Sequence, residues 1–143
     1  MGADLYIHKL FDKQKKKYEP LFAKAVSKRD NAILPSEQKE YQKDVDKYYE
    51  KMYSKGYFRD SYNEGNILNR LGLSYWRDFP AFMKGRNITP KNAEILAKMI
   101  ERRELDLKGV SEKDKKYFIE GKKELVNFLR TAKKLNAVID ASI

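Results

Sequence analysis

The chain has 143 residues, of which 41% are hydrophobic and 36% are charged. This length fits one ordinary domain with its own core; the apolar content is too high for a disordered protein and the charge too high for a membrane protein. The chain has no cysteine, which excludes disulfides, thiol catalysis and cysteine-based metal sites and fits a reducing cytoplasm. We therefore expect a single cytoplasmic domain spanning residues 1–143.

The formal net charge of +10 is spread along the chain, and its one dense run is KQKKK at residues 13–17. A dispersed surplus of lysine is typical of a solvated surface, whereas a stripe rich in arginine would favour phosphate binding. Nucleic acid therefore stays open as a partner. A membrane is not expected, because no apolar run approaches the ~18 residues that a membrane span needs.

The first half of the chain predicts a short strand and two helices. Weak alternation of apolar residues over 3–8 indicates the strand. Apolar residues at helical spacing over 11–30 indicate the first helix, and Pro20 within it predicts either a later start or a kink. Ser36 predicts the N-cap of a second helix that ends near Gly56, with an apolar stripe of half-buried tyrosines.

The second half predicts four helices and a short apolar tail. Two short helices are expected over 64–71 and 74–84. Two longer ones are expected over 89–103 and 111–136, and each begins with a capping Thr or Ser. The tail after residue 136 is partly β-branched and could pair with the N-terminal strand. The fold class that follows is mainly α: a compact helical bundle of five to six helices with a small two-stranded sheet.

The segment over residues 56–79 differs in composition from the rest of the chain. It has no lysine, and it combines aromatic residues with arginine, aspartate and asparagine: GYFRDSYNEGNILNRLGLSYWRDF. Such a mixture either closes a core around buried polar pairs or forms a binding site. The sequence leaves both alternatives open.

Two groups within this segment are candidates for ligand binding. In the first, Arg59 could grip a carboxylate or a phosphate while Tyr62 and Asn63 orient it. The structural alternative, which we favour, is that Asp60 or Ser61 caps the next helix and Arg59 pairs with an internal carboxylate. The second group is Trp76, Arg77 and Asp78, in which Trp76 could stack on a ring but is more often a core anchor.

No motif for catalysis or cofactor binding is present in the sequence. His8 is the only histidine, so a serine nucleophile or a zinc site would have to use it, and the glycine-rich phosphate loops are absent. We predict no metal and no cofactor, and we assign no catalytic residue. His8 remains a weak candidate for binding or acid–base work because its reference pKa is near neutrality.

Four stretches of the chain, MGADLYI, MYSKGYFRDSYN, LGLSYWRD and IDASI, resemble a family of small, uncharacterised bacterial and phage-associated proteins. The chain departs from that pattern at Tyr75, where many relatives would carry tryptophan. The resemblance implies no established activity, fold or cofactor. It does suggest that the following residues form one spatial unit: Asp4, Tyr6, Arg59, Asp60, Tyr62, Asn63, Trp76 and Asp78.

The function expected from these observations is that of a non-catalytic binding or regulatory protein. Its partner would be a protein or a small anionic ligand, and the phage association suggests a setting in phage–host conflict. One alternative is a nucleic-acid-binding module that uses the positive charge. Another is a small enzyme with Arg59 as the anchor for an anionic substrate and Asp60, Tyr62 or His8 as acid or base. Oligomeric state is not predicted.

Overall fold

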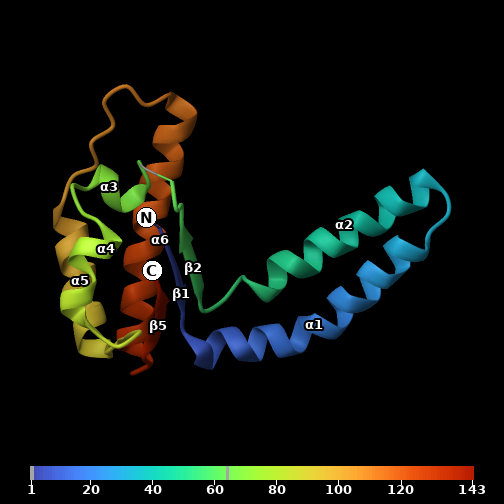
Figure 1. Cartoon of the computed structure of the whole chain (residues 1–143), viewed down its shortest axis with the longest axis horizontal. Coiled ribbons are helices and arrows are strands. Elements are labelled where there is room, and N and C mark those ends of the chain that lie inside the picture. Colours follow the sequence, from blue (N-terminus) through green and yellow to red (C-terminus); the bar gives the residue numbers. More distant parts are fainter. Residues whose placement is uncertain (1, 64) are drawn as a thin grey trace. The chain divides into compact units, whose positions relative to one another are not determined.

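The computed structural model describes residues 2–63 and 65–143, and in this part of the chain the protein is mainly helical (Figure 1). It is 63% helix and 11% strand, which confirms the mainly-α class. The elements, in chain order, are β1 (Ala3–Tyr6), α1 (His8–Asn31), α2 (Pro35–Met52), β2 (Tyr57–Asp60), α3 (Ile67–Arg70), α4 (Tyr75–Asp78), the 3₁₀ turn η1 (Pro80–Phe82), β3 (Met83–Lys84), β4 (Asn87–Ile88), α5 (Pro90–Arg102), α6 (Glu112–Lys134) and β5 (Ile139–Ser142).

Contacts within the chain divide it into two compact units. The first, which we call the sheet unit, comprises Met1–Ile7 and Tyr57–Ile143; of these, Met1 and Glu64 lie outside the described residues. The second, the helical hairpin, is His8–Gly56 and consists of α1, α2 and their connections. The prediction of a single domain stays a prediction.

The sheet unit is built on a five-stranded antiparallel sheet in the order β2-β1-β5-β4-β3. The predicted pairing of the N-terminal segment with the tail is confirmed, with Asp4 opposite Ser142 and Tyr6 opposite Asp140. The sheet is larger than the two strands expected, because β2 pairs with the other side of β1 and the β3–β4 hairpin pairs with β5. Both termini of the chain therefore meet inside this sheet.

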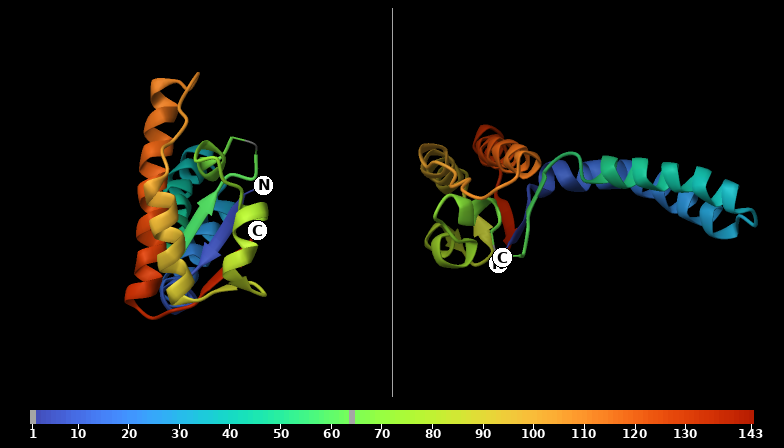
Figure 2. Two further views of the ribbon diagram at one scale, coloured as in Figure 1. Left: turned by 90° about the vertical axis from the view of Figure 1, so that its left-hand side faces the viewer. Right: turned by 90° about the horizontal axis from the view of Figure 1, so that it is seen from above.

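One face of the sheet forms the core of this unit. Because side chains alternate along a strand, Ala3 and Leu5 of β1 point to the same side and are buried, and Phe58 of β2 continues that layer. The ring of Phe58 lies 6.2 Å from that of Phe128, which places α6 against the sheet. Figure 2 shows α5 beside α6 on this side. The other face of the sheet carries polar side chains and is described below.

Capping residues set the starts of the two long helices of the sheet unit. The hydroxyl of Thr89 accepts a hydrogen bond from the Asn92 amide at 3.2 Å, and the hydroxyl of Ser111 accepts one from the Asp114 amide at 3.3 Å, as predicted. Ser36 does not cap α2, which is a correction. Pro35 occupies the first position of that helix and Leu34 is its N-cap residue, without a side-chain bond.

In the helical hairpin, α1 and α2 pack along one seam of aromatic rings. Ring centroids lie 5.5 Å apart for Phe11 and Tyr53 and 6.5 Å apart for Tyr18 and Tyr48. α1 begins at His8 and is continuous through Pro20, so the later start is not observed, and a kink at Pro20 stays a prediction. As expected, most of the tyrosines on α2 are half-buried, but Tyr49 is 52% exposed.

Candidate functional site

The outward face of the sheet carries two rows of polar and aromatic side chains. Strand register places Tyr57, Tyr6, Asp140 and Asn87 side by side on β2, β1, β5 and β4. The next row, two residues further along, contains Arg59, Asp4 and Ser142. Residues two apart on a strand share a face, so both rows lie on the side opposite the core. We call this surface the polar sheet face.

The carboxylate of Asp4 is the centre of the polar sheet face. Its Oδ1 accepts a hydrogen bond from the Tyr57 hydroxyl at 2.5 Å, and its Oδ2 accepts one from the Tyr62 hydroxyl. Arg59 Nε lies 3.7 Å from Oδ1. The Tyr6 and Tyr57 rings contact each other at 5.2 Å between centroids. Asp4 is therefore held by three partners from β2 and the turn that follows it.

These contacts keep both phenols neutral. The hydrogen bond to Asp4 raises the pKa of Tyr62 to about 12, with smaller contributions from burial and from the carboxylate charge. Burial, together with the hydrogen bond to Asp4, raises the pKa of Tyr57 well above its usual value. A negative carboxylate favours the protonated form of a phenol that donates to it. At neutral pH, neither tyrosine can serve as a general base.

Two arginines on the polar sheet face are each anchored by an aspartate through Nε. Arg59 Nε faces Asp4, and the guanidinium lies over the Tyr62 ring at 5.4 Å. Arg86 Nε donates to Asp140 at 3.0 Å. Both arginine side chains are exposed, by 60% and 66%. Within the described part of the chain, the terminal nitrogens of these two guanidinium groups make no hydrogen bond.

Asp60 belongs to the core and not to this face. It is fully buried, and its carboxylate accepts hydrogen bonds from the Ser61, Ile67 and Leu68 amides and from the Tyr75 hydroxyl, at 2.8 to 3.2 Å. Asp60 thus accepts the first two amides of α3, but the N-cap residue of that helix is Asn66, whose side chain accepts the Asn69 amide, so the expectation that Asp60 or Ser61 is the cap is corrected. Arg59 does pair with a carboxylate, but the partner is the part-buried Asp4 and the arginine itself is exposed, since consecutive strand residues point to opposite faces.

The other candidate residues have contacts of their own. His8 begins α1 in the helical hairpin, where its Nδ1 lies 3.1 Å from Asp12 Oδ1. The Asn63 side chain is exposed, and the backbone amide of Asn63 donates to the Ser61 hydroxyl at 3.1 Å. Of the eight residues expected to form one unit, the polar sheet face thus brings together Asp4, Tyr6, Arg59 and Tyr62.

Trp76 is 69% exposed, so the expectation that it anchors the core is wrong. The neighbouring Tyr75 is the buried ring, because adjacent positions of the one-turn helix α4 face different directions. Arg77 and Asp78 pair with each other at 3.0 Å. Asp78 also accepts the Ser74 amide at 2.7 Å, and the Arg77 and backbone hydrogen bonds hold the pKa of its carboxyl below the usual value against the opposing effect of burial. This pair therefore stabilises the start of α4.

Sequence reasoning missed three residues of the polar sheet face: Tyr57, Arg86 and Asp140. Tyr57 could have been found from its spacing of two from Arg59, which puts both on one face of a strand, but this segment was not predicted to be a strand. Arg86 and Asp140 are 54 positions apart, and no local pattern connects them. Only the pairing of β4 with β5 brings them together.

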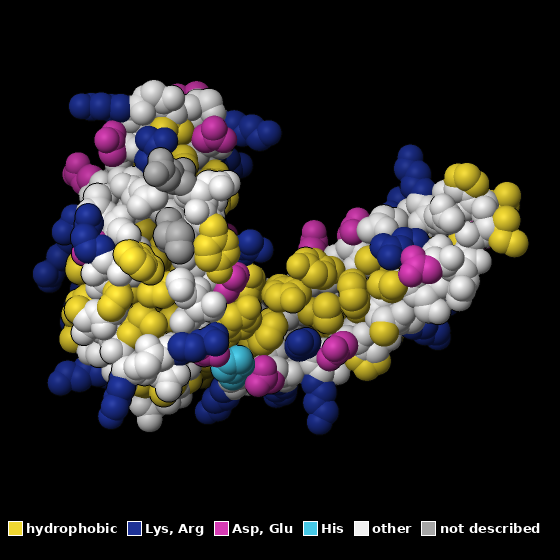
Figure 3. Space-filling view, viewed as in Figure 1, with side chains coloured by type: hydrophobic (Ala, Val, Ile, Leu, Met, Phe, Trp, Pro, Cys, Tyr) yellow, Lys and Arg dark blue, Asp and Glu magenta, His cyan; other side chains and the backbone are white. Residues whose placement is uncertain are grey.

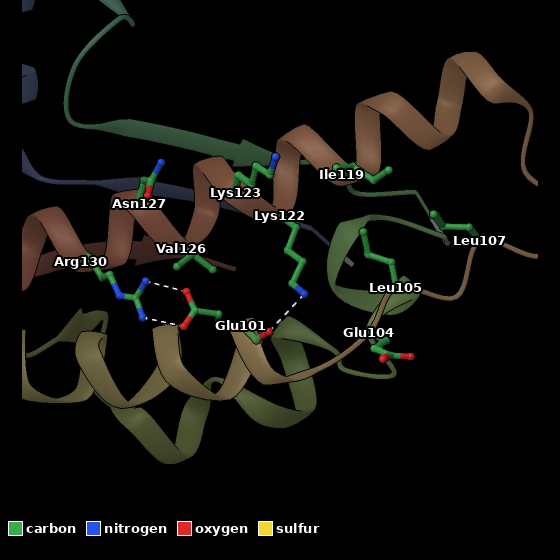
Figure 4. A pocket seen from close by; sticks show the side chains of 10 residues that line it. All are labelled: Glu101, Glu104, Leu105, Leu107, Ile119, Lys122, Lys123, Val126, Asn127 and Arg130. Carbon is green, nitrogen blue, oxygen red and sulfur yellow. Dashed lines mark hydrogen bonds and ion pairs between the residues drawn. The ribbon is translucent and has the colours of Figure 1, made fainter.

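A separate cavity of about 590 Å³ lies between α6 and the end of α5 with the loop that follows it (Figure 4). Three of the polar side chains that line it, Glu101, Lys122 and Arg130, are already hydrogen-bonded within the protein. Arg130 and Glu101 form a bidentate pair at 2.6 and 2.9 Å, and Lys122 Nζ donates to the backbone carbonyls of Glu101 and Arg103. These bonds tie α5 to α6, so we regard the cavity as part of the scaffold.

The described residues contain no group of three or more histidine, cysteine, aspartate or glutamate side chains placed to hold a metal ion. Among the same residues, no helix has the length and apolar character required to cross a bilayer. Comparison with known proteins yields no matching family model, no similar curated protein and no similar solved structure.

Proposed function

We propose that the protein is a non-catalytic binding protein that holds an acidic segment of a partner protein on the polar sheet face. One observation carries this proposal: Arg59 and Arg86 pair through Nε with Asp4 and Asp140, and within the described residues their terminal nitrogens make no hydrogen bond. A guanidinium fixed in this way can still donate two parallel hydrogen bonds to a carboxylate.

The chemistry of the face favours binding over catalysis. The Asp4 carboxylate already accepts two phenolic hydrogen bonds and forms an ion pair with Arg59, and the raised pKa values of Tyr57 and Tyr62 remove both phenols as bases. An enzyme that used Arg59 as its anchor would have to find its general base elsewhere. Asp60 cannot supply it, because its side chain is buried on the opposite side of the sheet.

The form of the surface favours an extended partner. Small-molecule sites are usually concave and bury most of the ligand, whereas a row of side chains across a sheet suits a chain that lies along it. An acidic segment with carboxylates at two positions would contact both arginines. The two aspartates on the same face would disfavour a uniform polyanion and favour a segment whose charges match the arginine positions.

Single-stranded nucleic acid is the second candidate, and the tyrosines favour it. Tyr6, Tyr57 and Tyr62 lie on or beside the same face as Arg59, and sheets with aromatic and arginine side chains commonly bind unpaired bases by stacking. The net charge of +10 would assist the approach of a phosphate backbone.

A cytoplasmic location, and a setting in phage–host conflict in a bacterium or phage, are also proposed. They are supported by the absence of cysteine and by the sequence resemblance described above.

The test is binding of a labelled glutamate-rich peptide and of a labelled oligothymidylate, measured by fluorescence anisotropy at several salt concentrations. We compare wild type with the double variant Arg59→Gln/Arg86→Gln. Arg102→Gln is the matched control, an exposed arginine on α5 away from this face.

The proposal expects the peptide to bind wild type and the control, and the double variant to lose affinity at least about tenfold, since each charged hydrogen bond contributes roughly 1.5–3 kcal/mol. Binding of the oligonucleotide alone, with the same loss, would favour the second candidate. Equal affinity of all three proteins for every probe would overturn the role of the two arginines.

A further inference from the structure

The two helices of the hairpin have fewer buried side chains than α6, which is of similar length. α1 has 24 residues and α2 has 18, yet each contributes only two buried residues: Phe11, Ala25, Val45 and Met52. α6, with 23 residues, buries seven. Helices in proteins are stabilised mainly by packing of their apolar face, so two helices of this length need a further layer.

Apolar side chains remain exposed along the hairpin and at its tip. Leu21 is 43% exposed and Tyr49 52% exposed on the two helices, and Ile33 and Leu34 in the connection are 90% and 54% exposed. The space-filling view shows hydrophobic side chains along the hairpin and at its end (Figure 3). An apolar surface of this extent on paired helices is typical of an interface.

The charges of the two helices indicate what covers this surface. α1 carries eight basic and three acidic residues, whereas α2 carries four basic and five acidic residues. α1 is therefore strongly positive and α2 slightly negative. A second hairpin that places its α2 against this α1 brings opposite charges together, and two-fold symmetry repeats that contact. Placing α1 against α1 would oppose two strongly positive helices.

We propose that the hairpin binds a second copy of this chain, forming a four-helix bundle in which α1 of one protomer packs against α2 of its partner. The exposed apolar side chains of both hairpins form the centre of this bundle, and the lysines of α1 and the carboxylates of α2 flank it. This inference is independent of the polar sheet face, because none of its residues belongs to that face.

The first experiment is sedimentation equilibrium of the full chain. Wild type should form a dimer, and Leu21→Gln should raise the dissociation constant at least about tenfold. Leu21 is 43% exposed, so each copy gains part of the ~1.5–3 kcal/mol of a fully buried leucine, and two-fold symmetry removes this contact from both protomers. Ile95→Gln is the matched control. Ile95 has the same kind of side chain with 42% exposure, on α5, so its loss should leave the dimer unchanged.

The second experiment tests which helices meet, and it uses two exposed residues, Lys24 on α1 and Asp44 on α2. Lys24→Glu and Asp44→Lys should each weaken self-association, and a mixture of the two variants should form a heterodimer more readily than either forms a homodimer. Circular dichroism verifies that the variants keep the helix content of wild type.

Three results would overturn the proposal. The first is a wild-type protein that stays monomeric at every concentration. The second is a dimer to which Leu21→Gln and Ile95→Gln are equally harmless or equally harmful. The third is a dimer strengthened by Lys24→Glu alone, since that would place α1 against α1.

Discussion

Asp60 organises the backbone around it. It is fully buried, and its four hydrogen bonds fix the end of β2, the start of α3 and the Tyr75 hydroxyl. Asp60→Asn should lower the free energy of unfolding by about 2 kcal/mol or more. An amide has only one accepting oxygen, and each buried donor left unpaired costs about 1–3 kcal/mol.

Chemical denaturation would measure this loss, with Asp140→Asn as the control. Asp140 is also a sheet aspartate, but its side chain is 25% exposed and its partner Arg86 is 66% exposed, so its ion pair is better solvated than the contacts of Asp60 and should contribute less. If Asp60→Asn lost no more stability than Asp140→Asn, the central role assigned to Asp60 would be contradicted.

Tyr62 makes the stability of the sheet unit sensitive to alkaline pH. Its pKa in the folded protein is about 12 against a reference value of 10.0, so the folded state favours the protonated phenol. The resulting stabilisation is complete below pH 10 and is lost as the pH rises from there to about 12. The free energy of unfolding of Tyr62→Phe should therefore fall less than that of wild type over this pH range.

Denaturant unfolding at a series of alkaline pH values would check this, and Tyr117→Phe provides a comparison. Tyr117 is about half exposed (51%), and its pKa is raised by partial burial and by the charges of Asp60 and Glu124, without a hydrogen bond to a carboxylate. Identical pH profiles for wild type and Tyr62→Phe would show that the bond to Asp4 contributes nothing to stability.

At the scale of the elements, Pro20 is the feature of α1 that weakens the helix. It lies inside α1, where proline lacks the amide that would bond one turn back and crowds the preceding turn. Pro20→Ala should therefore stabilise α1, by up to about 3 kcal/mol. Amide hydrogen exchange along α1 should slow in the variant.

Pro90→Ala is the control for this prediction. Pro90 occupies the first position of α5, where the missing amide would have no partner within the helix, so its replacement should change stability by a few tenths of a kcal/mol only. Unchanged exchange in α1 after Pro20→Ala would mean that the helix already accommodates the proline without cost.

Local patterns in the sequence were sufficient for most helices and insufficient for most strands. Thr89 and Ser111 were identified as caps because a cap bonds to an amide only three residues away. β2 was not predicted, because each of its faces carries one aromatic and one charged residue. Phe58 and Asp60 lie on the core side and Tyr57 and Arg59 on the polar sheet face, so apolar and polar residues do not alternate. β3 and β4 have only two residues each and depend on pairing with β5.

The candidate site was predictable only where its residues are close in sequence. Arg59 and Tyr62 were selected from one short block, and their ring and guanidinium do stack. Asp4 was added from the resemblance, and Asp4 and Arg59 are opposite each other in the β1–β2 pairing. The role of Asp140 depends on a strand order that brings the two ends of the chain together, which no short window of sequence contains.

For the molecule as a whole, the positive charge is divided evenly between the units. The helical hairpin has 13 basic and 8 acidic residues and the sheet unit has 18 and 13, so each carries half of the net +10. Within the hairpin the surplus lies on α1. A polyanion would therefore be attracted to both units, and the salt dependence of binding alone would not identify which unit it contacts.

The register of β1 and β2 has a topological consequence. Tyr6 and Tyr57 are paired neighbours in the sheet, yet 50 residues separate them in the chain, and nearly all of these form the helical hairpin. The hairpin is thus an insertion between two paired strands that a short turn would otherwise connect. Closing a long loop costs only slightly more entropy than closing a shorter one, since the cost grows with the logarithm of length. The insertion can therefore lengthen, shorten or be exchanged during evolution while the sheet keeps its register.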